Sequence, residues 1–192
     1  INFITSDCGI PYELESEEHH EMLKIHVAEL VLILAVLSKG GSFVAKFFFP
    51  VHRTIEYHVL YLLYNLFQEL IFYKPRVNIF SKEFYIIGHK YQGIEETMLQ
   101  KIRELVGNNF SIDATIYSEI PTFFIQQLSV VQRKMVDDYI LNFKKQLFYV
   151  DNHEELKLGR NFLDQIKIII RNKNEDWCQD NQLVPIKSSD RL

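Results

Sequence analysis

The feature that most constrains the fold is an apolar run from Ser42 to Phe49, which ends at Pro50. Its aromatic and β-branched residues favour a strand. The lack of alternating polar residues predicts a central strand that is buried on both faces. Lys46 is the one charged residue in the run. A lysine is tolerated in such a strand only if it is paired or functional, so Lys46 is a candidate for either role.

The sequence before this run predicts a strand followed by a helix. Residues 1–5 have the composition of a buried strand, and Ser16 is positioned to cap a helix that extends to Gly40 and Gly41. Apolar residues at helical spacing predict the face of this helix that packs inward. These residues are Leu23, Val27, Leu30, Val31 and Leu34.

After Pro50 the alternation continues and then gives way to helices. A helix is predicted over residues 53–68, then strands over residues 70–73 and 83–89 that can form an antiparallel pair. The order predicts a mixed α/β fold, with part of an open Rossmann-like sheet and an antiparallel edge hairpin.

From Ile94 onward the pattern is helical, with helices predicted over residues 95–106, 121–150 and 154–182. We therefore predict two parts, a sheet domain over residues 1–93 and a helical extension over residues 94–192.

Composition excludes several classes of protein. The longest apolar run, Leu30 to Leu37, is far shorter than the roughly 20 residues of a membrane-spanning helix. The only cysteines are Cys8 and Cys178, which suggest neither a disulfide framework nor a zinc motif. The formal net charge of -4 argues against a general nucleic-acid coat, although a local basic cleft is compatible with it. Because Ile1 already belongs to a strand pattern, we expect the first residue to be a cut edge.

Asp7, Lys46 and Glu83 lie at or beside the ends of predicted strands. Ligands of open α/β sheets bind outside the carboxyl ends of the parallel strands, and an antiparallel strand begins at that same edge. The three side chains are therefore expected to converge. Tyr85 follows Glu83 by two residues and should share its face of the strand, as a supporting or a core residue.

Three segments carry a family resemblance: Thr5–Gly9 (TSDCG), Gly40–Phe48 (GGSFVAKFF) and Ser81–Gly88 (SKEFYIIG). In order and spacing they resemble the last three motifs of FtsJ-like ribose 2'-O-methyltransferases. The extension from Ile94 to Leu192 is similar to that of homologues in large cytoplasmic DNA viruses such as African swine fever virus.

The resemblance implies an enzyme that transfers a methyl group from S-adenosyl-L-methionine to RNA, and the cap of viral messenger RNA is the expected target. Asp7, Lys46 and Glu83 correspond to the last three members of the family's Lys-Asp-Lys-Glu tetrad, and Asp7 also lies near the methionine end of the cofactor. The first lysine and the glycine-rich cofactor loop are expected in an N-terminal half upstream of Ile1, so the fragment alone should be inactive. The expected location is the cytoplasm, in a viral factory or a virion.

The chemistry suits these side chains, because a ribose hydroxyl is a poor nucleophile that a positioned lysine can polarise or deprotonate. Burial lowers the pKa of a lysine and neighbouring carboxylates raise it, so Asp7 and Glu83 can set the protonation state of Lys46. Lys74 and Arg76 flank a proline in a predicted loop near this site. They are equally compatible with RNA phosphate or cap contacts and with a solvated loop.

Other residues have competing interpretations. The histidines His19, His20 and His26 suggest a metal site, but their spacing favours a solvated helix start. Cys8 is better explained as a small packed residue than as a nucleophile. The aromatic run from Phe47 to Phe49 can stack RNA bases, although core packing is the simpler explanation.

Two further functions remain open at this stage. One is a ribosomal RNA 2'-O-methyltransferase, since target choice depends on loops. The other is a catalytically silent module in which the helices from Pro121 to Gln182 bind a protein partner or RNA.

Overall fold

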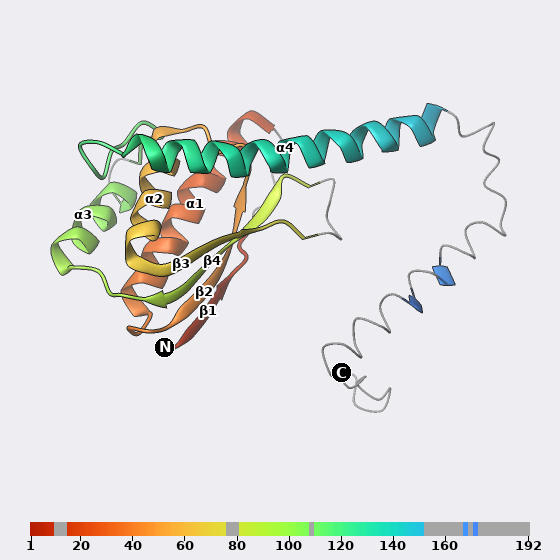
Figure 1. Ribbon diagram of the computed structural model, residues 1–192. Coiled ribbons are helices and arrows are strands. Elements are labelled where there is room, and N and C mark those ends of the chain that lie inside the picture. The colour runs from red at the N-terminus through yellow and green to blue at the C-terminus, as the bar shows by residue number, and fades with distance from the viewer. Residues whose placement is uncertain (10–14, 76–80, 108–109, 152–166, 169–170, 173–192) are drawn as a thin grey trace. The chain divides into compact units, whose positions relative to one another are not determined.

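The computed structural model describes residues 1–9, 15–75, 81–107, 110–151, 167–168 and 171–172 (Figure 1). Contacts divide the chain into two compact units, Ile1–Phe143 and Lys144–Leu192. In the second unit the described residues are helical, and the account below concerns the first. The predicted boundary between residues 93 and 94 lies inside the first unit. Leu99 and Ile102 after it belong to the same core as the sheet, and a division into two domains there stays a prediction.

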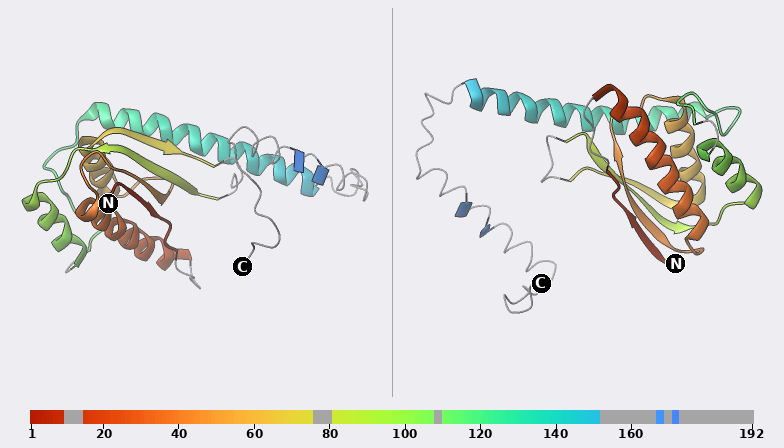
Figure 2. Two further views of the ribbon diagram at one scale, coloured as in Figure 1. Left: turned by 90° about the horizontal axis from the view of Figure 1, so that it is seen from below. Right: turned by 180° about the vertical axis from the view of Figure 1, so that it is seen from behind.

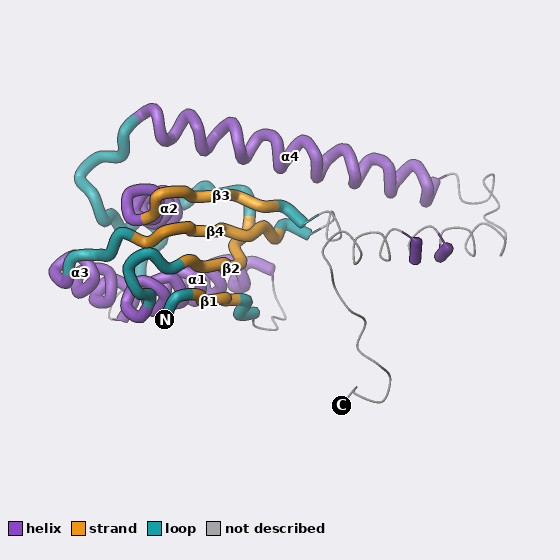
Figure 3. The backbone as a smooth tube through the Cα atoms, turned by 60° about the horizontal axis from the view of Figure 1, so that its bottom comes forward, coloured by secondary structure: helices purple, strands orange, loops and turns teal. Residues whose placement is uncertain are grey.

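Four strands form one sheet: β1 (Phe3–Ser6), β2 (Ser42–Phe48), β3 (Phe67–Tyr73) and β4 (Glu83–Tyr91). Their order is β1-β2-β4-β3, as Figure 3 shows. β1 and β2 are parallel, and β4 is antiparallel to both of its neighbours. It follows that β3 runs parallel to β2 although the two are not adjacent. The antiparallel pairing predicted for the last two strands is present, and the β3–β4 pair lies at one edge of the sheet. The order within the pair was not predicted: β4 lies inside the sheet and β3 forms the edge, because the crossover through α2 leaves one strand position free.

The described helices are α1 (Glu15–Val36), α2 (Thr54–Leu66), α3 (Glu96–Gly107) and α4 (Thr122–Asp151). α1 starts at Glu15, one residue before the expected cap, and ends earlier than predicted. Gly40 then adopts a left-handed φ of 80°, and its N–H donates to the Tyr91 carbonyl oxygen at 2.7 Å. This turn directs the chain into β2, since glycine reaches positive φ without strain. The helix predicted over residues 154–182 lies mostly outside the described residues.

The core lies on one face of the sheet. Figure 1 shows α1 and α2 behind the strands, and the right panel of Figure 2, seen from behind, shows them in front. The predicted inward face of α1 is confirmed, because Val27 and Leu30 are among its buried residues. The β2 residues that face these helices are buried, namely Phe43, Ala45 and Phe47.

The opposite face of the sheet corrects two predictions. β2 alternates between buried and half-buried residues and is therefore not buried on both faces. The first strand is not a buried strand either, since Phe3 is 60% exposed and β1 pairs with a neighbour on one side only. The apolar composition of these strands predicted that both of their faces are covered. Among the described residues, however, the helices cover only one face of the sheet.

Candidate active site

The parallel pairing of β1 with β2 places Asp7 beside Lys46. Ser6 of β1 is the register partner of Ala45 of β2. The residues that follow them, Asp7 and Lys46, therefore lie side by side at the carboxyl end of the two strands. The Lys46 Nζ and Asp7 Oδ1 atoms are 2.5 Å apart, which is an ion pair with a short hydrogen bond. The Lys46 side chain is only 11% exposed and the Asp7 side chain is 63% exposed. The lysine is thus held in the sheet while the carboxylate faces outward.

β4 supplies the remaining groups. Tyr85 is the register partner of Lys46, and Glu83 is the partner of Phe48. Directly paired residues of an antiparallel ladder share a face, so both side chains lie on the Lys46 side of the sheet. Both also act on the Lys46 ammonium through their charges. The three tetrad-like residues are therefore brought to one end of the sheet, with Tyr85 beside them.

The protonation state of Lys46 follows from its surroundings. Burial lowers the pKa of Lys46. The hydrogen bond and charge of Asp7, followed by the charges of Glu83 and Tyr85, outweigh burial, and the pKa is raised above the usual lysine value. Lys46 is therefore an ammonium at neutral pH. As such it donates hydrogen bonds and stabilises negative charge, and it accepts a proton only after losing its own.

Lys74, a predicted RNA contact, is engaged by the protein backbone. Its Nζ donates to the carbonyl oxygens of Ser81 at 2.5 Å and Glu83 at 2.6 Å. The ammonium also lies 5.4 Å from the centre of the Phe49 ring, a cation–π contact. Burial lowers the pKa of Lys74 and the charge of Glu83 opposes that shift. These contacts anchor the start of β4, and the other predicted RNA contact, Arg76, lies outside the described residues.

Glu29 of α1 supports the loop that carries Asp7. Its Oε1 accepts a hydrogen bond from the Cys8 backbone N–H at 3.2 Å. Among the described residues its Oε2 is buried without a hydrogen-bond partner. Sequence reasoning missed this residue, and the available signal was a lone carboxylate in an apolar helical stretch. Cys8 itself is exposed and free, which contradicts its interpretation as a packed residue.

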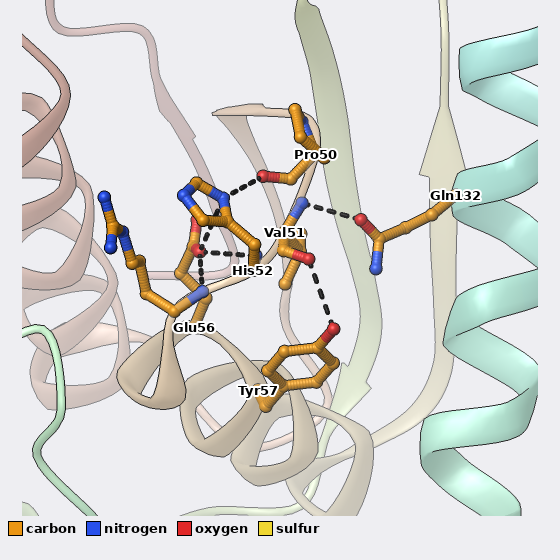
Figure 4. Close-up of polar contacts among 7 residues, drawn as sticks. Pro50, Val51, His52, Glu56, Tyr57 and Gln132 are labelled. Atoms are coloured by element: carbon orange, nitrogen blue, oxygen red, sulfur yellow. Dashed lines mark hydrogen bonds and ion pairs between the residues drawn. The ribbon is translucent and has the colours of Figure 1, made fainter.

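The turn after β2 is fixed by the buried Glu56, as Figure 4 shows. Its Oε2 accepts hydrogen bonds from the backbone N–H groups of His52 at 2.9 Å and of Arg53, the N-cap residue of α2, at 2.7 Å. From α4, Gln132 Oε1 accepts from the Val51 N–H at 2.6 Å. The end of β2, and with it Lys46, is thereby held from two helices.

His26 differs from its expected solvated state. It is 3% exposed, and its ring lies 5.3 Å from the rings of both Phe47 and Phe48. Burial, and secondly the charge of Lys46, lower the pKa of His26 to about 4, so the ring is neutral at physiological pH. In the described part of the chain no group of three or more His, Cys, Asp or Glu residues could hold a metal ion. No described helix is long and apolar enough to cross a membrane.

Comparison with known proteins gives viral relatives. No protein-family model matches the chain. The chain is 30% identical over 196 residues to Uncharacterized protein L511 of Acanthamoeba polyphaga mimivirus, across 98% of this chain and 24% of that protein. It is 24% identical over 198 residues to Probable methyltransferase EP424R of African swine fever virus, isolate Pig/Kenya/KEN-50/1950, across 100% of this chain and 45% of that protein.

Among solved structures, a ribosomal RNA methyltransferase from Plasmodium falciparum matches with a TM-score of 0.40 and 18% identity, over 49% of this chain and 48% of that chain. The predicted likeness to an African swine fever virus protein is confirmed at the level of sequence. The chain spans less than half the length of both viral relatives, and it is similar to them throughout its own length.

Proposed function

We propose that this chain carries the catalytic residues of an FtsJ-like, S-adenosyl-L-methionine-dependent RNA ribose 2'-O-methyltransferase that acts on the cap of viral messenger RNA. The observation that carries the proposal is the Asp7–Lys46 ion pair at the carboxyl end of β1 and β2, with Glu83 and Tyr85 beside it. The name Probable methyltransferase, borne by the African swine fever virus relatives, supports methyl transfer as the reaction class.

In this proposal Lys46 acts on the ribose 2'-hydroxyl. Its ammonium donates a hydrogen bond to the hydroxyl oxygen and stabilises the negative charge that develops there while the hydroxyl proton is released to solvent water. Asp7 holds the ammonium in place through the 2.5 Å contact. Glu83 keeps the lysine charged from the neighbouring strand β4. Since the ion pair exists before substrate binds, the site is preorganised for this role.

The exposed Asp7 fits the cofactor proposed for this family. S-adenosyl-L-methionine supplies an electrophilic methyl group when bound, and its amino-acid end carries an ammonium. A carboxylate that is 63% exposed beside β1 can pair with such a cation, while its Oδ1 stays on Lys46. Asp7 is accordingly assigned a second role as a cofactor contact. The glycine-rich loop and the first lysine of the tetrad belong, in this proposal, to the part of the protein that precedes Ile1.

One observation favours a second candidate function, an interaction module. α4 exposes large apolar side chains that a partner can cover, including Val130 at 71% and Leu141 at 52%. The proposed enzyme and the module differ in one measurable respect: only the enzyme transfers a methyl group. Both can hold for one protein, because α4 and the Lys46 site are separate in sequence.

The test is methyl transfer by the intact natural protein. Tritiated S-adenosyl-L-methionine is supplied with capped RNA, with the same RNA already methylated at the 2'-oxygen, and with ribosomal RNA. The proposal expects tritium in the capped RNA and none in the premethylated control, and digestion should release a 2'-O-methylated nucleoside. Transfer to ribosomal RNA in place of capped RNA would move the assignment to that substrate. No transfer to any RNA would leave the interaction module as the better account.

A further inference from the structure

A cavity of about 150 Å³ lies next to the proposed active site and has no role in the account above. It is lined by Met22, Leu23 and His26 of α1, by Phe47 and Phe48 of β2, and by residues at the start of α2. His26 is buried, whereas His52 on the α2 side has a side chain that is 43% exposed. The cavity therefore extends from the surface toward the interior at the carboxyl end of β2, the edge where α/β sheets bind ligands.

His26 is the unusual member of this lining. Within the described residues its Nε2 is buried and has no hydrogen-bond partner. An unsatisfied buried polar atom costs about 1–3 kcal/mol, and such atoms in proteins call for an explanation. A neutral imidazole offers one donor and one acceptor, so it can bond to either kind of group on a ligand. The unsatisfied nitrogen points to a ligand that supplies this missing bond.

The walls specify the shape of that ligand. A cavity on the order of 150 Å³ holds one ring of about the size of benzene. The Phe48 and His26 rings stack on each other with centroids 5.3 Å apart and an interplanar angle of 30°, so a guest cannot lie between them, but both rings line the cavity and present flat aromatic surface to it. A nucleobase is a flat ring with hydrogen-bonding groups on its edge, and proteins pack unstacked bases against aromatic side chains.

The position of the cavity beside Lys46 indicates which base of the RNA it binds. Lys46 lies directly before Phe47 and Phe48 in β2, and its charge acts on His26. We infer that the cavity binds one base of the RNA substrate, at or next to the nucleotide whose ribose lies at Lys46, with the Phe48 ring packing on the base and His26 Nε2 bonding its edge. This inference rests on the proposed function and deepens it, because it gives the enzyme a base-reading pocket. Of the two interpretations of the aromatic run, base stacking then applies to Phe48, while Phe47 and Phe49 are core residues at 1% and 3% exposure.

The test uses binding by the chain itself, without cofactor. The probes are the four nucleoside 5'-monophosphates, titrated and observed by saturation-transfer NMR. Met22→Trp fills the cavity, and His26→Phe keeps an aromatic ring but removes its nitrogens. Leu32→Trp is the matched control, since Leu32 lies on the same helix and is 65% exposed. At least one monophosphate should bind wild type and Leu32→Trp equally. Binding should be at least about tenfold weaker in Met22→Trp and about five- to tenfold weaker in His26→Phe.

Thermal unfolding distinguishes a role of His26 in base binding from a role in the stability of the fold. His26→Phe removes an unsatisfied polar atom, so its unfolding temperature should not fall although its binding weakens. Equal binding in Met22→Trp and wild type would overturn the inference, as would the absence of binding by all four monophosphates. Competition by S-adenosylhomocysteine would assign the cavity to the cofactor's adenine and overturn the RNA source.

The proposed function is tested separately by methyl transfer in the intact protein. If Met22→Trp abolishes base binding but the intact protein methylates no RNA, the base-binding pocket is supported and the proposed enzymatic function is contradicted. If Met22→Trp still transfers the methyl group with the same preference for the target base, the proposed function is supported and the base-binding pocket is contradicted.

Discussion

At the scale of single residues, the charge on Lys46 decides what the site can do. Its side chain is 11% exposed, yet three neighbouring side chains raise its pKa above the usual value against the effect of burial. A lysine held in this way serves as a fixed cation. Its expected contribution is therefore to the transition state, where charge develops on the attacking oxygen.

The first prediction concerns Lys46→Ala in the intact protein. Methyl transfer should fall by at least about 100-fold, while cofactor binding by calorimetry stays nearly unchanged. The unfolding free energy should change little through the lost ion pair, since Asp7 is 63% exposed and such pairs contribute about 0–1 kcal/mol. Lys46→Met is the control for the alkyl stem and should be equally inactive. Near wild-type transfer by either variant would show that Lys46 is not the catalytic lysine.

A second prediction follows from the order of causes behind the Lys46 pKa. Asp7→Asn removes the charge and weakens the hydrogen bond that raise this pKa, but leaves the burial that lowers it. The pKa of Lys46 should therefore be lower in Asp7→Asn than in wild type. The measurement is NMR titration of the Lys46 side-chain Cε resonance from pH 8 upward, given as a comparison of the two proteins. An unchanged or higher value in the variant would contradict the role assigned to Asp7.

His26 makes stability depend on acid pH. Its folded-state pKa is lowered from 6.5 to about 4, so between these values the unfolded chain binds a proton that the folded chain does not. Stability is full above pH 6.5 and is lost as the pH falls toward 4, by an amount on the order of 3 kcal/mol. His26→Phe should remove this loss. Thermal unfolding of wild type and His26→Phe at several pH values checks this prediction, and an equal loss of stability in both proteins would contradict it.

At the scale of elements, the site depends on where β4 begins. β4 lies between β2 and β3, and its first residue, Glu83, is paired with Phe48 at the end of β2. Lys74 at the end of β3 bonds the carbonyl oxygens of Ser81 and Glu83. One half-buried ammonium thus sets the position of the strand end that carries Glu83.

The prediction at this scale is that Lys74→Met loosens the start of β4. The loss of two hydrogen bonds from a charged donor should lower the unfolding free energy by about 1–3 kcal/mol in urea titrations. Amide hydrogen exchange at Glu83 and Phe84 should become faster, and methyl transfer should fall because Glu83 is displaced. Lys82→Met, an exposed lysine of the same turn, is the matched control and should leave all three unchanged. Unchanged exchange in Lys74→Met would show that Lys74 does not anchor the strand.

At the scale of the whole molecule, charge limits how the chain can meet RNA. The full sequence has a formal net charge of -4, so a broad basic surface is not its means of binding. Recognition in our proposal relies on a few groups near Lys46 and on the neighbouring cavity. This differs from proteins that follow the phosphate backbone with many lysines and arginines.

The corresponding prediction is a shallow salt dependence. Binding of an uncapped single-stranded RNA by this chain, measured by fluorescence anisotropy between 50 and 200 mM salt, should show a log–log slope no steeper than about -2. That value corresponds to the release of about three counterions from a single strand. A slope of about -5 or steeper would reveal an extended basic surface and contradict this mode of recognition.

Much of the architecture, and the placement of Asp7, Lys46 and Glu83 at one end of the sheet, could be predicted from the sequence. The inward face of α1 was predicted from helical spacing, and Leu23 and Leu34 are buried there. The lysine inside an apolar strand predicted a partner, and Asp7 is that partner. These features are local. Helical periodicity and the cost of burying a charge both depend on nearby residues, which the sequence itself specifies.

Tertiary structure alone decided the rest. The insertion of β4 between β2 and β3 depends on how the crossover through α2 spans the sheet, and no residue pattern encodes a skipped strand position. The engagement of Lys74 by two backbone carbonyl groups and the support of the Cys8 N–H by Glu29 join residues from different elements. The burial of His26 required the end of β2 to pack against the middle of α1. Such contacts depend on relative placement in space, which spacing along the chain does not determine.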